Sequence, residues 1–204
     1  TGNEEAMAFT FIMQNIAANL GGMITPFGNP QNLYLYAYYN IGTLEFMKIM
    51  APTFFTATVL ILGICLFVKP VKLTLKKDND YRLDKKRTLI YTILFIASIL
   101  IVFRVIPYTY GTIAVTAALL FLDSKALKQV NYPLLATFCV FFVFSGNMAR
   151  IPAVNEFFSQ LLPVNTLLFG ILSCQVISNV PTAVLLTDYQ ALLPAVNIGG
   201  CGTL

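Results

Sequence analysis

The sequence predicts an all-α, polytopic membrane protein with inverted repeats, broken transmembrane helices and a re-entrant hairpin. Three observations lead to this fold class. Of the 204 residues, 57% are hydrophobic and 11% are charged, and the mean hydropathy is +0.75, whereas soluble domains carry about 25% charged residues. Several apolar stretches reach the roughly 20 residues that a helix needs to cross a bilayer. Finally, polar stretches that contain glycine and proline interrupt the apolar sequence.

Four apolar stretches are candidate membrane spans. Residues 44–68 are the clearest, and residues 88–106 and 132–149 also have enough apolar length. Residues 108–122 are shorter and contain Gly111, which predicts a break in that helix. We expect this fourth stretch to span only where the bilayer thins or where its ends are buried in protein.

The distribution of basic residues predicts the orientation of these spans. Eight of the thirteen Lys and Arg residues lie in the loop 69–87, against three aspartates there. Short loops enriched in Lys and Arg remain on the cytoplasmic side of a membrane. We therefore expect an integral protein of the cell (plasma) membrane, surrounded by lipid, with loop 69–87 in the cytoplasm. A basic run is also compatible with binding anionic lipid or nucleic acid, but next to two spans its role in topology is favoured, and we expect no nucleic-acid partner.

A short motif occurs twice in the chain. N-[LI]-G-G-x-x-T starts at Asn19 and again at Asn197, 178 residues later, and each copy interrupts an apolar run. The first copy continues to residue 32 with two prolines, a further glycine and the amides Asn29, Gln31 and Asn32. The two copies predict a pair of broken helices in related positions.

Residues 151–187 predict the relative direction of the two copies. Their apolar part, residues 161–177, is interrupted at Pro163 and ends in Ser-Asn-Val-Pro-Thr at 178–182, before a short apolar run. This pattern is typical of a re-entrant helical hairpin, since irregular backbone at membrane depth must be buried in protein or line a cavity. A hairpin returns to the side it entered, so the copies would be inverted. One complete crossing would instead make them parallel.

The polar breaks indicate a binding site near the middle of the membrane. Each unpaired backbone group in lipid costs several kcal/mol. Discontinuous helices nevertheless occur in transporters, because their N-termini attract anions while unwound carbonyls coordinate cations. A packing kink is the alternative explanation for one break. Three breaks of matching chemistry, two of them repeats, favour a site.

These motifs resemble those of the ion transporter superfamily, which groups citrate-transporter-like permeases, divalent anion/sodium symporters, arsenite permeases and a class of sodium/proton antiporters. The resemblance covers most of the chain. It implies an elevator-type secondary transporter, usually a homodimer, whose substrate and coupling ion lie between hairpin tips and broken helices. The dicarboxylate symporters carry Ser-Asn-Thr at the tip, whereas Val180 is the third residue here. That difference favours the more divergent permeases.

The resemblance also assigns candidate substrate- or ion-binding residues. In the first break they are Gly21, Gly22, Thr25, Gly28, Asn29 and Pro30; on the hairpin tip, Ser178 and Asn179; and in the second break, Gly199, Gly200 and Thr203. Asn19, Asn32, Thr182 and Asn197 lie in the same polar stretches and complete the set. Asp188 could carry a proton, or it lies in an external loop.

The predicted function is secondary active transport of an anion, a carboxylate or oxyanion, coupled to sodium or protons and without a cofactor. A sodium/proton antiporter of the same superfamily is the alternative, followed by a channel or a structural membrane subunit. An enzyme is not expected, because the chain has no histidine and no lysine near Ser178 to activate a nucleophile. The four cysteines show no pairing typical of a metal site or a disulfide framework.

We expect the chain to be an internal part of a longer protein. Residues 1–68 would form the end of a first repeat, 69–87 a cytoplasmic basic linker, and 88–204 a second repeat. The second repeat would end at the start of its broken helix, so about half of the site would lie in this chain.

Overall fold

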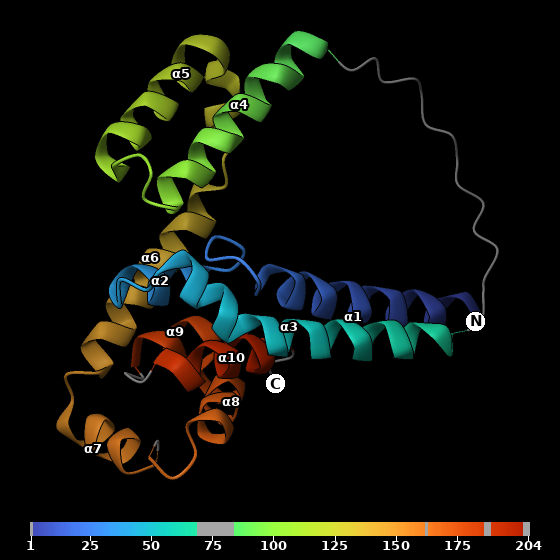
Figure 1. Cartoon of the computed structure of the whole chain (residues 1–204), viewed down its shortest axis with the longest axis vertical. Helices are drawn as coiled ribbons and strands as arrows, with labels where there is room; N and C mark the ends of the chain where they lie inside the picture. Colours follow the sequence, from blue (N-terminus) through green and yellow to red (C-terminus); the bar gives the residue numbers. More distant parts are fainter. Residues whose placement is uncertain (1, 69–83, 162, 186–188, 202–204) are drawn as a thin grey trace. The chain divides into compact units, whose positions relative to one another are not determined.

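The computed structural model describes residues 2–68, 84–161, 163–185 and 189–201, and it is helical throughout, with ten α-helices in the described residues (Figure 1). The all-α fold class is therefore confirmed. The chain divides into two compact units, residues 1–69 with 133–204, and residues 70–132. Each unit is described separately. The predicted division into the end of one repeat and a second repeat stays a prediction.

The first half of the larger unit contains the first predicted break. Helix α1 (Gly2–Gly22) ends at the repeated motif, and α2 (Pro30–Tyr38) begins after a seven-residue irregular segment. Helix α3 (Thr43–Leu66) covers the predicted span 44–68. It packs beside α1, as the two blue and teal ribbons show (Figure 1). The sequence therefore located both the break and the span that follows it.

The second half of this unit contains five helices. They are α6 (Tyr132–Met148), α7 (Pro152–Leu161), α8 (Thr166–Ile177), α9 (Asn179–Leu185) and α10 (Tyr189–Gly199). Helix α10 packs against α8, α9, α2 and α3, and α9 packs against α2. Segments more than 140 residues apart in the sequence thus share one core.

The segment predicted to form a re-entrant hairpin, residues 151–187, contains the helices α7, α8 and α9 among its described residues. The bend between α6 and α7 is 87°, and the bounds of the re-entrant hairpin stay a prediction. Helix α7 has apolar residues on one face and polar residues on the other, which is typical of a helix at a boundary rather than a membrane-crossing arm. The apolar residues are Val154, Phe157, Phe158 and Leu161. Helices α8 and α9 meet at Ser178.

The core of the larger unit lies where α2, α3 and α8–α10 meet. Its fully buried apolar side chains come from both halves of the chain, with Phe46 and Met50 on α3 and Leu192, Leu193 and Val196 on α10 among them. Tyr36 of α2 packs edge-on against Phe46. Burial of a side chain of this size stabilises the fold by about 1.5–3 kcal/mol, so the breaks are held by a packed apolar core.

The smaller unit is a pair of packed helices, α4 (Lys85–Val102) and α5 (Tyr108–Lys128). The predicted break at Gly111 is wrong, because the helix continues through this residue. Gly111 is buried, and a Cβ there would lie 2.6 Å from Ile101 Cδ1 and 3.2 Å from Ile106 Cγ2. The glycine is therefore needed for close packing of the helices. The irregular position is Asp123, with φ −155° and ψ 76°.

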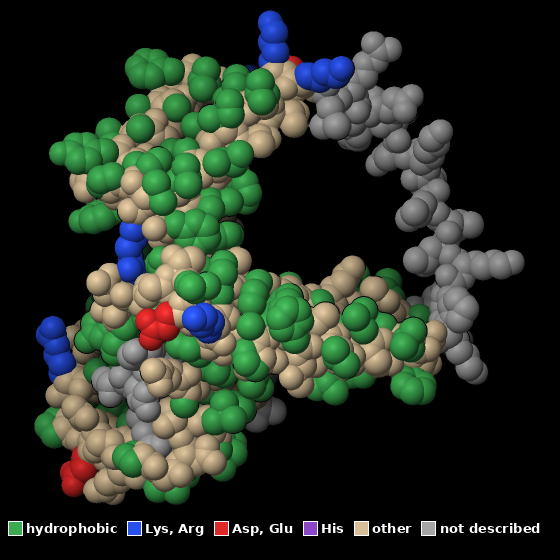
Figure 2. Space-filling model, viewed as in Figure 1, with side chains coloured by type: hydrophobic (Ala, Val, Ile, Leu, Met, Phe, Trp, Pro, Cys, Tyr) green, Lys and Arg blue, Asp and Glu red, His purple; other side chains and the backbone are tan. Residues whose placement is uncertain are grey.

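Two helices among the described residues are long and apolar enough to cross a membrane alone, α3 and α5, and the bent pair α6 and α7 makes a third candidate. Helix α4 covers most of the predicted span 88–106 but ends at Val102 and carries three basic residues in its first turn. Hydrophobic side chains cover much of the visible surface (Figure 2). This composition supports a polytopic membrane protein, since lipid replaces water around exposed apolar side chains.

Candidate functional site: two helix breaks joined by asparagine

The first break is built around a close contact of two glycines. Gly22 ends α1, and Gly28 lies so close to it that a Cβ on Gly28 would overlap the Gly22 backbone. Backbone bonds from Thr25 N to Gly22 O (3.5 Å) and from Gly28 N to Thr25 O (3.2 Å) close the turn. Pro30 then occupies the first turn of α2, where its missing N–H costs nothing. Local sequence chemistry thus explains both where the helix stops and where it restarts.

Asn197 of α10 joins this break to the second copy of the motif. Its Oδ1 accepts from Asn29 Nδ2 at 2.9 Å and from Gln31 Nε2 at 3.3 Å. Its Nδ2 donates to Asn32 Oδ1 at 2.6 Å and to Leu193 O at 2.8 Å. All four amide side chains are buried. We call Asn29, Gln31, Asn32 and Asn197 the amide cluster.

The amide cluster also bonds to the backbone that the first break leaves irregular. Asn29 Nδ2 donates to Asn19 O at 2.9 Å, so the side chain of Asn29 connects the first residues of both copies of the motif. Asn32 Nδ2 lies 3.4 Å from each of three carbonyl oxygens, those of Gly22, Met23 and Thr25. These distances exceed the usual 2.9–3.0 Å. The NH₂ group of Asn32 has two hydrogens for three acceptors, so its hydrogen bonds to these carbonyls are long and weak.

The hairpin tip is strained at Ser178. Its φ of 72° and ψ of 163° lie in a region that is essentially restricted to glycine and costs about 1–3 kcal/mol. Local hydrogen bonds hold it: Thr182 Oγ1 donates to Ser178 O at 2.7 Å, and Asn179 Oδ1 accepts from Val180 N at 2.9 Å and Ser178 Oγ at 3.3 Å. Strain of this kind clusters at binding sites.

Replacing Ser178 by glycine is expected to raise the free energy of unfolding by about 1 kcal/mol, because glycine adopts positive φ without steric cost. The matched control is Ser173→Gly, in the middle of α8, which should lower it by about 1 kcal/mol. Thermal unfolding of the purified variants in detergent measures both. A destabilised Ser178→Gly protein would contradict the strain at the tip.

The end of α10, where the second copy of the motif predicts a break, lies against this tip. A Cβ on Gly199 would lie 2.6 Å from Cys174 Cβ, and one on Gly200 would lie 2.5 Å from Asn179 Nδ2. Close approach therefore requires glycine at 199, whereas a Cβ on Gly200 would displace the Asn179 side chain. Gln175 Nε2 donates to Gly199 O at 2.9 Å and satisfies a carbonyl at the end of α10. The tip and the end of α10 thus form one packed cluster.

The candidate residues fall into two neighbouring groups joined through α10. The first group, at the first break, comprises Asn19, Gly22, Thr25, Gly28, Asn29, Pro30, Asn32 and Asn197; the second, at the tip, comprises Ser178, Asn179, Thr182, Gly199 and Gly200. Gly21 is exposed, with nothing within 4 Å of an added Cβ. Thr203 and Asp188 lie outside the described residues.

Two amides of this region were not among the predicted site residues. Gln31 lies between Pro30 and Asn32, so the polar stretch itself pointed to it. Gln175 is an isolated polar residue in the apolar run of α8, three positions before Ser178, and this helical spacing was the available signal. Every candidate residue that the structure describes is uncharged. The arrangement therefore offers amides, hydroxyls and backbone groups as ligands.

Comparison with known proteins gives a matching family. A family model described as citrate transporter matches residues 6–198, which include the whole first group of candidate residues and, of the second group, Ser178, Asn179 and Thr182. The chain belongs to the citrate transporter family. No solved structure matches it.

The chain is also similar to two curated proteins. The chain is 39% identical over 197 residues to the uncharacterized transporter MJ0456 of Methanocaldococcus jannaschii, and 28% identical over 201 residues to the inner membrane protein YbiR of Escherichia coli. Each match covers 95% of this chain and 54% of the relative. The chain therefore spans about half the length of the curated relatives it matches. The resemblance to a superfamily that includes citrate-transporter-like permeases is confirmed.

Proposed function

We propose that the protein is a secondary active transporter of an anion, a carboxylate or oxyanion, driven by sodium or protons. The observation that carries this proposal is the amide cluster, in which a residue of the second break, Asn197, bonds to three side chains of the first. A chain that spans lipid gains little from two buried helix breaks unless their polar groups are used. Membership of the citrate transporter family supports the same function.

The groups at the breaks favour an anion. Helix α2 starts at the first break, and the N–H groups of its first turn have no acceptors within the helix. They give this end a partial positive charge of about half an electron. Asn29, at the N-cap position, makes no side-chain cap and donates instead to Asn197. An anion can be bound here by neutral donors, without burying a cationic side chain.

A sodium/proton antiporter is the second candidate. The observation that favours it is the set of backbone carbonyls of Gly22, Met23 and Thr25, because carbonyl oxygens also suit a small cation. We also propose that the protein lies in the cell membrane with loop 69–87 in the cytoplasm, and that it assembles as a homodimer.

Uptake by the full-length protein in proteoliposomes tests the proposal. A panel of di- and tricarboxylates and inorganic oxyanions is offered while sodium and proton gradients are imposed separately. Saturable accumulation of one anion under one gradient is the expected result. Sodium-for-proton exchange without anion flux would select the antiporter, and non-saturating conductance would indicate a channel.

Replacing Asn29 or Asn179 by leucine is expected to reduce uptake about a hundredfold or more. Asn29→Leu removes the hydrogen bond to Asn197, and Asn179→Leu removes the hydrogen bond that Val180 N donates at the tip. The matched control is Asn155→Leu on the exposed side of α7, which should leave uptake unchanged. Membrane insertion is measured for all variants. Normal uptake by both break variants would contradict the site assignment.

A further inference from the structure

The smaller unit has a second polar cluster at the end where α4 begins and α5 finishes. Arg87 in the first turn of α4 lies 3.6 Å from Asp123 Oδ2, and the Tyr91 hydroxyl donates to the same oxygen at 2.6 Å. Asp123 Oδ1 accepts from Ala126 N at 3.3 Å and caps the last turn of α5. These contacts bring the two helix ends side by side. This end adjoins the loop that is predicted to be cytoplasmic.

Five cations surround this cluster. Lys85, Lys86 and Arg87 occupy the first turn of α4, and Lys125 and Lys128 follow the irregular residue of α5, all with exposed side chains. Figure 2 shows blue side chains projecting where α4 begins. Among the described residues at this end, five cations face two carboxylates, Asp84 and Asp123, a net charge of +3.

The two carboxylates are already engaged within the unit. Asp84 accepts from the backbone N–H groups of Lys86 and Arg87 as the N-cap of α4, and Asp123 is held by Tyr91 and Ala126. The Arg87 side chain stays 65% exposed despite its ion pair. Cations in the first turn of a helix also oppose its dipole, so helix stability does not account for them. Their charge remains available to an external anion.

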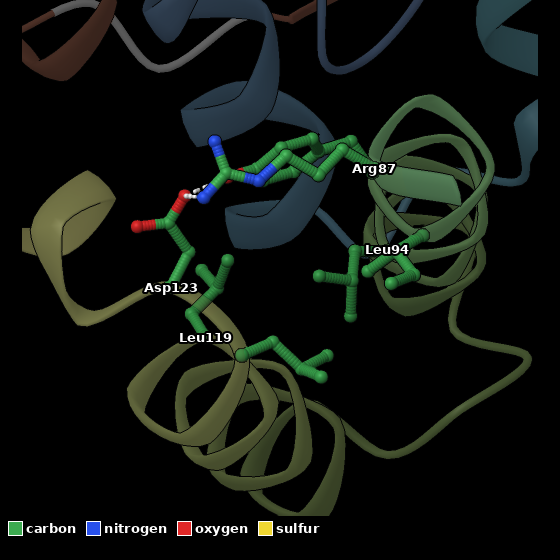
Figure 3. Close-up of a pocket in the computed structure, with 7 residues that line it drawn as sticks. Arg87, Leu94, Leu119 and Asp123 are labelled. Atoms are coloured by element: carbon green, nitrogen blue, oxygen red, sulfur yellow. Dashed lines mark hydrogen bonds and ion pairs between the residues drawn. The ribbon is translucent and has the colours of Figure 1, made fainter. Parts of the chain in front are cut away.

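The groove beneath these cations is apolar. It is lined by Ile90 and Leu94 of α4 and by Leu119 and Leu122 of α5, together with the polar side chains of Arg87, Tyr91 and Asp123. Figure 3 shows Arg87 and Asp123 beside each other, with Leu94 and Leu119 on the two helices. Tyrosines concentrate where membrane meets water. Beside the groove, Phe121 is 91% exposed, which is typical of a lipid-facing side chain. A charged mouth above an apolar wall matches a molecule with an anionic head and a hydrocarbon tail.

We propose that this end of α4 and α5 binds an acidic phospholipid of the cytoplasmic leaflet. The phosphate lies among the five cations, and the acyl chains lie against exposed apolar side chains of α5 such as Phe121 and Leu122. Because the backbone at Asp123 is not helical, the turn that carries Lys125 and Lys128 does not continue the regular helical geometry of the rest of α5. This surface shares no residue with the amide cluster, and the proposal does not depend on what the protein transports.

Native mass spectrometry of the delipidated full-length protein tests the proposal. The protein is titrated with phosphatidylglycerol or with phosphatidylcholine of the same acyl chains. We expect preferential binding of phosphatidylglycerol, reduced about tenfold by Lys125→Gln with Lys128→Gln. The eight basic residues of loop 69–87 remain in this variant to maintain its topology. A second variant, Lys85→Gln with Lys86→Gln, should give a similar loss.

The matched control is Lys48→Gln with Arg150→Gln, which removes two exposed cations of the larger unit and should leave binding unchanged. Equal affinity for the two lipids, or equal loss in the control, would overturn the proposal. Inorganic pyrophosphate is added as a competitor. Displacement of the lipid at comparable concentration would mean that free phosphate compounds, rather than a lipid, occupy the site. Because binding rather than flux is measured, failure of the proposed transport function would leave this result interpretable.

Discussion

Replacing Asn197 by alanine is expected to abolish transport and to lower the free energy of unfolding by about 3 kcal/mol. The substitution leaves Asn29 Nδ2 with one acceptor fewer and Asn32 Oδ1 without its 2.6 Å donor, both in a buried environment. Each buried polar group left unsatisfied costs about 1–3 kcal/mol. Thermal unfolding in detergent and uptake by proteoliposomes measure the two effects.

The matched control for this substitution is Asn147→Ala, since Asn147 is an exposed asparagine of α6. It should leave stability and uptake near those of the unmodified protein. If Asn197→Ala and Asn147→Ala behave alike, the amide cluster neither holds the breaks together nor serves transport. A variant that loses stability but keeps uptake would assign Asn197 a structural role alone.

Adjacent glycines of the first break are expected to respond in opposite ways to alanine. A Cβ on Gly22 would lie 2.9 Å from Gly28 O and would overlap the Asn29 side chain, whereas a Cβ on Gly21 would have nothing within 4 Å. Gly22→Ala should therefore displace Asn29 from the amide cluster, lower stability by about 2–3 kcal/mol and abolish uptake. Gly21→Ala should gain about 0.5–1 kcal/mol of helix stability.

The same unfolding and uptake assays distinguish these two variants. A Gly22→Ala protein with normal uptake would mean that the turn adapts without moving Asn29. A loss of uptake in Gly21→Ala would show that this exposed glycine contacts something outside the described chain, such as the substrate.

Hydrophobic length and turn chemistry predicted most of the helices. The apolar run 44–68 could form only a long buried or membrane helix, and α3 follows it closely. Gly22, Gly28 and Pro30 marked the first break because glycine permits close approach and proline starts a helix. The same reasoning gave a wrong prediction at Gly111. A glycine that breaks a helix and one that lets a helix approach its neighbour are identical in sequence, and Ile101 decides between them.

The hairpin shows a second limit of sequence reasoning. Its polar tip was visible as Ser-Asn-Val-Pro-Thr, but the sequence did not show that the residues before it form a separate helix, α7, with apolar side chains on one face. The 87° bend between α6 and α7 separates this helix from the span before it. Hydropathy averaged along a chain does not reveal which face of a helix carries the apolar side chains.

From the sequence alone, the membrane character of the chain, its helical class and the position of the first polar break were determined, because these depend on local composition and backbone preference. The sequence also showed that asparagine recurs at both breaks. Only the tertiary structure decided that Asn197 meets Asn29, Gln31 and Asn32, and that Gln175 reaches Gly199. Partners 24 to 168 residues apart come together through packing of α10 on α2 and α8, and no local pattern specifies which amide of a polar stretch faces that interface.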